Sequence, residues 1–276
     1  MQKRVQSPSS IKCYKHCPRK YYYAYIQGIR APPNIHQVRG HIVHSVLERF
    51  FDIDIDTSLI SLNDFEVNLK LKVQKLLVKE WQAQNPKIKN LNLSKEQEIF
   101  YFEESLLMLL SWVEYFCNKL SREQGSFQER FKRLTPLREQ IYKSEALFAK
   151  GIIDAIETDR DGHIRLMDYK TSASQDLNEH ILQLAIYSLL YFEKHGKMPK
   201  HAGVYFLKGE EKVMNVDEKL LELAKKEIEF MHENTKSVKI EDYPKCPGPL
   251  CKWETGKCEY FDICKPFETK KEPHSF

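Results

Sequence analysis

One predicted β-hairpin constrains this chain more than any other feature. Residues 150–172, KGIIDAIETDRDGHIRLMDYKTS, contain two apolar, β-branched runs separated by a turn signal around Asp161. A turn centred near Asp161 puts Asp154 opposite Asp168, within about one residue of register. Because side chains alternate along a strand, Asp168 and Lys170 project from the same face. The sequence therefore predicts two carboxylates and one ammonium group on a single patch of sheet.

Carboxylates that face each other across two strands repel, so this arrangement needs compensation. A divalent cation can supply it, because hard cations take carboxylate oxygens and keep open positions for water and phosphate. The alternative is an ordinary solvated Asp–Lys pair, which is common on strands. The DxK triplet is too short to decide between them. Together with the features below, the hairpin favours a metal-dependent phosphodiesterase site.

Two predicted helices carry further candidates. Residues 36–52 have the apolar stripe of an amphipathic helix, and His44 lies beside that stripe. His44 is either a solvated side chain or an imidazole ligand for the metal. Residues 181–190 are apolar almost all round, yet Gln183 and Tyr187 stand one turn apart on one face. Since a buried amide and phenol need partners, they form either a structural pair or a pair that orients Lys170 or a phosphate.

The cysteines indicate a second metal centre. Four of the seven crowd the C-terminal region, and Cys17 lies near the N-terminus. The polar N-terminus and the lack of a bilayer-length apolar run predict no membrane association and a reducing compartment, cytoplasmic or nucleoid-associated. Clustered cysteines there bind metal more often than they form disulfides. Their spacing suits zinc or an iron–sulfur cluster equally.

Basic and aromatic residues alternate near the N-terminus. The net charge of +4 is too small to indicate nucleic-acid binding by itself. Lysines and arginines interleaved with tyrosines can hold a single strand through phosphate contacts and base stacking. The alternative is that these tyrosines pack on the core. The residues predicted to contact nucleic acid are Arg19, Lys20, Tyr22 and Arg39.

The order of these motifs resembles the RecB-type branch of the PD-(D/E)XK nuclease superfamily over nearly the whole chain. His44 stands in RGxxxHxxLE, Asp154 in GIID, Asp168 and Lys170 in DYKT, and QxxxY follows. The N-terminal SxSSIKCYKHCPRKYYY and the C-terminal cysteines resemble the iron–sulfur members. These include CRISPR-associated adaptation nucleases, AddB-type nuclease domains and related phage and eukaryotic exonucleases.

The resemblance implies an α/β fold with an αβββαβ mixed-sheet core. It implies one nuclease domain over residues 1–276, a helical insertion at 55–135, and a Cys-rich tail at 242–268 that closes on Cys17. Glu145, on a strand predicted at 140–148, is a weaker candidate for an outer contact with the metal.

Cofactors and site residues follow from the same resemblance. Mg²⁺ or Mn²⁺ would be held by His44, Asp154, Asp168 and the backbone carbonyl of Tyr169. The catalytic set is Lys170, Asp168, Asp154, Gln183 and Tyr187. A 4Fe–4S cluster would be held by Cys17, Cys251, Cys258 and Cys264, with zinc as the alternative. Six residues separate Cys251 from Cys258, where the family usually has CxxC, so Cys246 is a rival second ligand.

The expected function is an exonuclease that prefers single-stranded DNA ends, in DNA repair, recombination or CRISPR spacer processing. Two alternatives stay open. The chain has no GxxxxGK phosphate loop, so it could be an accessory subunit that docks on a helicase or integrase complex. It could instead be a zinc-stapled nucleic-acid-binding protein.

Overall fold

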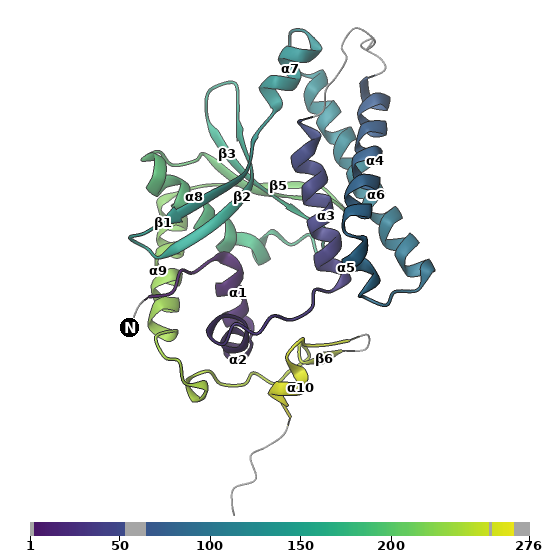
Figure 1. The fold of residues 1–276 in the computed structure, drawn as a ribbon. Coiled ribbons are helices and arrows are strands. Elements are labelled where there is room, and N and C mark those ends of the chain that lie inside the picture. Colours follow the sequence, from purple (N-terminus) through teal and green to yellow (C-terminus); the bar gives the residue numbers. More distant parts are fainter. Residues whose placement is uncertain (1–2, 53–64, 254–255, 268–276) are drawn as a thin grey trace, which may run out of the picture. The chain divides into compact units, whose positions relative to one another are not determined.

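The computed structural model describes residues 3–52, 65–253 and 256–267 (Figure 1). The chain divides into two compact units. The first comprises Met1–Pro32, Glu145–Lys150 and Lys225–Phe276, and the second comprises Pro33–Ser144 and Gly151–Ala224. Cys17 and the cysteine-rich tail belong to the same unit, which their predicted closure requires.

A mixed five-stranded sheet forms the centre of the second unit. Its strands are β1 (Leu137–Ser144), β2 (Ala149–Thr158), β3 (Ile164–Lys170), β4 (His201–Phe206) and β5 (Glu211–Asn215), in the order β1-β2-β3-β4-β5. The hairpin strands β2 and β3 are antiparallel, β3 and β4 are parallel, and β4 and β5 are antiparallel. The parallel pair is connected through α8 (Ile181–His195). This order confirms the predicted α/β fold.

Helices α3 to α7 share one hydrophobic core with the sheet. Phe50 of α3, Trp112 and Phe116 of α6, and Met167 and Tyr169 of β3 are buried in it. Capping boxes begin α3, α6 and α7, because Asn34, Ser94 and Ser126 each accept a bond from the backbone three residues on. The helices are α3 (Ile35–Phe50), α4 (Phe65–Ala83), α5 (Asn85–Lys89), α6 (Lys95–Ser121) and α7 (Phe127–Leu134). Of these, α4 to α7 lie within the predicted insertion at 55–135, whose predicted start at 55 lies outside the described part.

Helix α8 packs against the sheet and is buried from Leu184 to Tyr191, as its apolar composition predicts. Gly151 allows this close approach. A Cβ atom at Gly151 would lie 2.9 Å from Cε1 of Tyr187 and 3.2 Å from Cδ1 of Leu190. The glycine of the GIID motif therefore lets α8 bring its polar pair against the hairpin.

The first unit has its own aromatic core. Tyr21 and Tyr243 are almost fully buried, and their rings stack with centroids 6.2 Å apart. Gln6 joins the unit by a parallel bridge to Ala149. Its elements are α1 (Pro8–His16), α2 (Pro18–Tyr21), η1 (Tyr22–Ile26), most of α9 (Glu218–Asn234), η4 (Ile240–Asp242), β6 (Lys252–Trp253), β7 (Gly256–Lys257) and α10 (Phe261–Cys264). Among the described residues, no helix is both long and apolar enough to cross a membrane.

One predicted strand has different bounds. The strand expected at 140–148 begins at Leu137 and ends at Ser144, and residues 145–148 form a turn. Phe148 in that turn has a φ of 47°, a left-handed conformation that is uncommon for a non-glycine residue. Glu145 therefore lies in a turn and not on a strand.

Candidate active site

The hairpin has the predicted turn and register. Gly162 has a φ of +75°, and the Asp159 carboxylate accepts bonds from the backbone N–H groups of Asp161 and His163. The β2–β3 pairing runs from Thr158↔Ile164 to Ala155↔Met167. One further step in this register brings Asp154 level with Asp168. At this point the Asp154 side chain takes the place of a backbone acceptor between β2 and β3. Its Oδ2 accepts the backbone N–H of Tyr169 at 2.8 Å.

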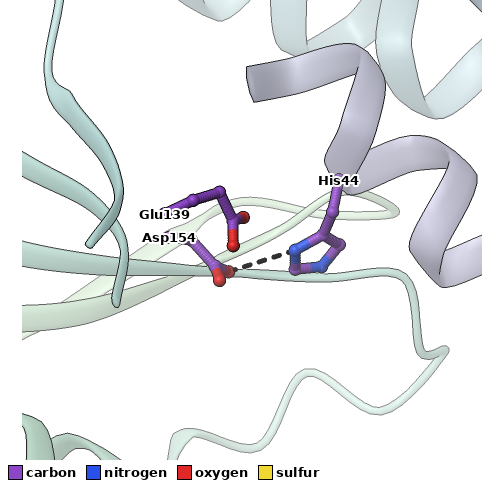
Figure 2. A group of neighbouring side chains, drawn as sticks. All are labelled: His44, Glu139 and Asp154. Atoms are coloured by element: carbon purple, nitrogen blue, oxygen red, sulfur yellow. Dashed lines mark ion pairs between the residues drawn. The ribbon is translucent and has the colours of Figure 1, made fainter. Parts of the chain in front are cut away.

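Three side chains meet beside this point, as Figure 2 shows. His44 of α3, Glu139 of β1 and Asp154 of β2 each offer one ligand atom, and these atoms lie within 4.8 Å of one another. Nδ1 of His44 lies 3.4 Å from Oδ2 of Asp154. An imidazole nitrogen with two carboxylate oxygens is a donor set that suits Mn²⁺ and related divalent cations. The residues present therefore fit a divalent metal. The group contains His44 and Asp154 of the predicted ligands together with Glu139, and Asp168 lies outside it.

Glu139 was missed by the sequence reasoning, which pointed to Glu145. Its backbone φ is 47°, a left-handed conformation that is unusual for a non-glycine residue in a strand. Irregular strand conformations of this kind re-aim side chains next to active sites. Burial, helped by the charge of Asp154, raises the pKa of Glu139 to about 7. The local sequence LREQI contains no glycine or other turn residue that would predict a positive φ at Glu139.

The charges of His44 and Asp154 stabilise each other. Burial lowers the pKa of His44, but the Asp154 carboxylate outweighs burial and raises this pKa to about 9. Burial raises the pKa of Asp154, but His44 and the bond from Tyr169 outweigh burial and lower it. A divalent metal would bind His44 only as the neutral imidazole, so metal binding would release this proton.

The second carboxylate is held by α8 and by Lys170. Asp168 is 2% exposed, and its Oδ1 accepts a 2.7 Å bond from Nε2 of Gln183. The same Nε2 donates to the Tyr187 hydroxyl at 2.8 Å, so both amide hydrogens are used. Nζ of Lys170 lies 2.6 Å from Oδ2 of Asp168. The predicted roles of the Gln–Tyr pair were a structural one or the orientation of Lys170 or a phosphate; the amide instead contacts Asp168, which in turn contacts Lys170.

Burial raises the pKa of Asp168 to about 6, although the neighbouring Lys170 charge opposes the rise. The pKa of Lys170 is raised, because the Asp168 charge outweighs the cost of burial, so the lysine is an ammonium at neutral pH. Tyr169, between them, turns its N–H toward Asp154. Since N–H and C=O of one strand residue point to the same side, its carbonyl faces β2 as well.

Arg39 does not offer the exposed cation predicted for nucleic-acid contact. Its side chain is buried in an ion pair with Glu104, and Nη2 donates to the Thr171 carbonyl at 3.2 Å. A buried guanidinium with protein partners cannot bind a phosphate without leaving them. The prediction for Arg39 is therefore wrong.

The N-terminal candidates are also engaged within their own unit. Tyr22 is buried, with its ring centroid 5.2 Å from that of Tyr243, so it packs on the core and does not stack a base. Nε of Arg19 donates to the Tyr243 carbonyl at 2.7 Å, and Lys20 pairs with Glu259 at 2.9 Å. The core alternative was the correct one for Tyr22, and contact of Arg19 and Lys20 with nucleic acid stays a prediction.

The predicted cluster cysteines lie around one cavity of about 300 Å³ in the first unit. Cys17, Cys251, Cys258 and Cys264 line it, and so does the rival Cys246. The backbone N–H of Cys258 donates to the Cys251 carbonyl at 2.9 Å. Within the described ranges, no three cysteine sulfurs lie within 4.8 Å of one another.

The chain matches the PD-(D/E)XK nuclease superfamily over residues 6–265 and belongs to it. It is therefore a hydrolytic nuclease whose substrate is nucleic acid, and nucleases of this superfamily use divalent metals. Fourteen solved chains are similar in structure. One is a "putative exonuclease" from Eubacterium rectale, with a TM-score of 0.53 and 14% identity over 99% of this chain and 91% of that chain. At that identity the likeness establishes the fold. Curated proteins yield no match.

The proposed role of Glu139 as a metal ligand can be tested directly. The Glu139→Gln substitution keeps the size of the side chain and removes one anionic ligand. We expect the affinity for Mn²⁺, measured by titration calorimetry, to fall by about tenfold or more. Glu145→Gln is the matched control and should leave the affinity unchanged. Equal affinities for Glu139→Gln and the wild type would remove Glu139 from the ligand set.

Proposed function

We propose that this nuclease is a RecB-type, Mg²⁺- or Mn²⁺-dependent deoxyribonuclease that acts as an exonuclease on single-stranded DNA ends. The observation that carries the proposal is the meeting of His44, Glu139 and Asp154 beside a strand that presents Asp168 and Lys170. The fold shared with the Eubacterium rectale protein, which is named for exonuclease activity, also supports it.

His44, Glu139 and Asp154 would hold the catalytic metal, joined by Asp168 and the Tyr169 carbonyl. When bound, a divalent cation lowers the pKa of a water molecule and neutralises charge on the scissile phosphate. Asp154 is kept in place for this role by the N–H of Tyr169, which leaves its other oxygen free to face the metal. Gln183 holds Oδ1 of Asp168 in the same way, while Oδ2 of Asp168 contacts Lys170.

Lys170 would act through its charge. Protonated, it is a poor metal ligand, but it can stabilise the negative charge that develops on the phosphate oxygens. Its ammonium is already aimed by the contact with Asp168. Tyr187 would act indirectly. It accepts a hydrogen bond from Gln183 and so holds this amide in place, and Gln183 in turn donates to Asp168.

The preference for single strands rests on the flexibility of the substrate. Duplex DNA is stiff, with a persistence length of about 50 nm, whereas a single strand can bend to bring one phosphate to side chains that lie on a sheet beneath helices. The void beside His44, Glu48 and Glu139 is about 10 Å³, which is room for one water molecule near the proposed metal.

We propose that the cysteines bind a 4Fe–4S cluster through Cys17, Cys251, Cys258 and Cys264. These cysteines and Cys246 line one cavity of about 300 Å³, which supports a shared inorganic group. The resemblance of the N-terminal SxSSIKCYKHCPRKYYY to the iron–sulfur members favours a cluster over a single zinc ion. The N-terminal and C-terminal segments of the first unit would then be joined through this group. The pathway, and docking on a helicase or integrase complex, stay predictions.

The catalytic assignment predicts a separation of cleavage from binding. We expect Asp154→Ala, Asp168→Ala and Lys170→Ala each to abolish cleavage and to leave DNA binding largely intact, because contacts to other phosphates carry the affinity. His44→Ala should be severe but partial, since it removes one ligand among several. Cleavage and a filter-binding assay on the same strand measure both effects. Undiminished cleavage by Lys170→Ala would exclude the proposed site.

The cluster assignment predicts brown protein after anaerobic purification, with broad visible absorbance. Because metal binding organises such a segment, loss of one ligand should also lower the thermal stability. Cys251→Ser should bleach the protein, while Cys246→Ser should not. The reverse result would identify Cys246 as the ligand, and colourless protein with one stoichiometric zinc would refute the iron assignment.

The end requirement can be measured with linear and circular single strands of the same sequence. We expect rapid loss of the linear DNA and little cleavage of the circle, because threading needs a free end. Blunt duplex should be a weak substrate. Equal rates on linear and circular strands would contradict exonuclease action while leaving the metal site in place.

A further inference from the structure

Arg39 lies at the junction of three elements. Its side chain is 3% exposed, on the same helix as His44 and five residues before it. The guanidinium pairs with Glu104 of α6, donates to the Thr171 carbonyl at 3.2 Å, and lies 5.6 Å from the ring centroid of Tyr101. One side chain thus joins the His44 helix, an insertion helix and the end of the catalytic strand.

The contact with Thr171 lies directly beside the proposed catalytic lysine. Strand β3 ends at Lys170, whose carbonyl accepts the N–H of Leu207 at 2.9 Å. From Thr171 onward the chain leaves the sheet, so its position depends on contacts outside the ladder. Helix α3 lies next to this point, since a Cβ atom at Gly40 would be at an ordinary van der Waals distance of 3.6 Å from Oγ1 of Thr171.

The partner of Arg39 is itself fixed. Glu104 also forms an ion pair with Lys208, which follows β4. The Lys208 carbonyl accepts a 3.3 Å bond from Nε2 of Gln175, in the segment that follows Thr171. The segment after the catalytic strand is therefore tied at two points, at Thr171 through Arg39 and at Gln175 through Lys208.

We propose that Arg39 is a positioning residue that sets the distance between the His44 helix and Lys170, acting through Thr171. This inference rests on the proposed role of Lys170. A buried ion pair adds little net stability, because desolvation offsets the attraction. Its effect here is geometric: the planar guanidinium bonds Glu104 and Thr171 at once, which a lysine ammonium on a flexible stem does not reproduce.

The decisive variant is Arg39→Lys, which keeps the charge opposite Glu104 and loses the fork that reaches Thr171. Arg39→Ala removes both contacts. The matched control is Arg49→Ala, because Arg49 also lies on α3 and pairs with an insertion-helix residue, Glu80 at 2.6 Å, without contacting the catalytic strand. Each full-length protein is assayed on linear single-stranded DNA with Mn²⁺ for kcat, KM, Mn²⁺ affinity and Tm.

We expect Arg39→Lys to lower kcat by about 10- to 100-fold, as small misplacements of reacting groups do. Its KM, Mn²⁺ affinity and Tm should stay close to wild type, and Arg49→Ala should retain wild-type kcat. A kcat for Arg39→Lys within about threefold of wild type would overturn the inference. So would a loss of kcat that only parallels a fall in Tm, or an equal loss in Arg49→Ala. Failure of the proposed function would look different, because wild type would then not cleave or Lys170→Ala would still cleave.

Discussion

The site depends on one interaction, the electrostatic repulsion between Asp154 and Asp168, which lie level with each other on the two strands of the hairpin. Two carboxylates in a buried place repel each other and lose hydration. His44 lies beside Asp154, and the Lys170 ammonium lies beside Asp168. Oδ2 of Asp154 also accepts the Tyr169 N–H, and Oδ1 of Asp168 accepts the Gln183 amide. Tyr169 and Lys170 belong to the hairpin itself, but His44 and Gln183 come from α3 and α8, so these two helices have to pack on the hairpin to complete the site.

Most of this arrangement could be predicted because its signals are local. The turn around Gly162, the alternation along β3 and the one-turn spacing of Gln183 and Tyr187 are short-range patterns, and each fixes where a side chain points. The order of elements followed from the same periodicities. The predicted strand at 140–148 has other bounds because residues 145–148 form a turn that the apolar pattern did not indicate.

Other features depend on distant contacts or on backbone irregularity, and they could not be predicted. Glu139 enters the metal group through a left-handed backbone conformation. Arg39 reaches a carbonyl 132 residues away, so its sequence context gave no sign that it is buried. The Tyr22 pattern failed for a related reason. A sequence pattern of aromatic residues beside cations does not distinguish rings that stack on bases from rings that fill a core. Tyr22 is in the core because its ring packs against Tyr243, which is distant in the sequence.

The insertion helices contribute to the site as well as to the fold. Trp112 of α6 packs edge-on against Tyr169 with ring centroids 6.2 Å apart, and the His44 ring packs against the same tyrosine at 6.3 Å. Tyr169 is also the residue whose N–H holds Asp154. From the same helix, Glu104 holds Arg39, which bonds Thr171. Helix α6 thus supports residues on both sides of Lys170. The insertion between α3 and β1 therefore helps to keep the catalytic strand in place.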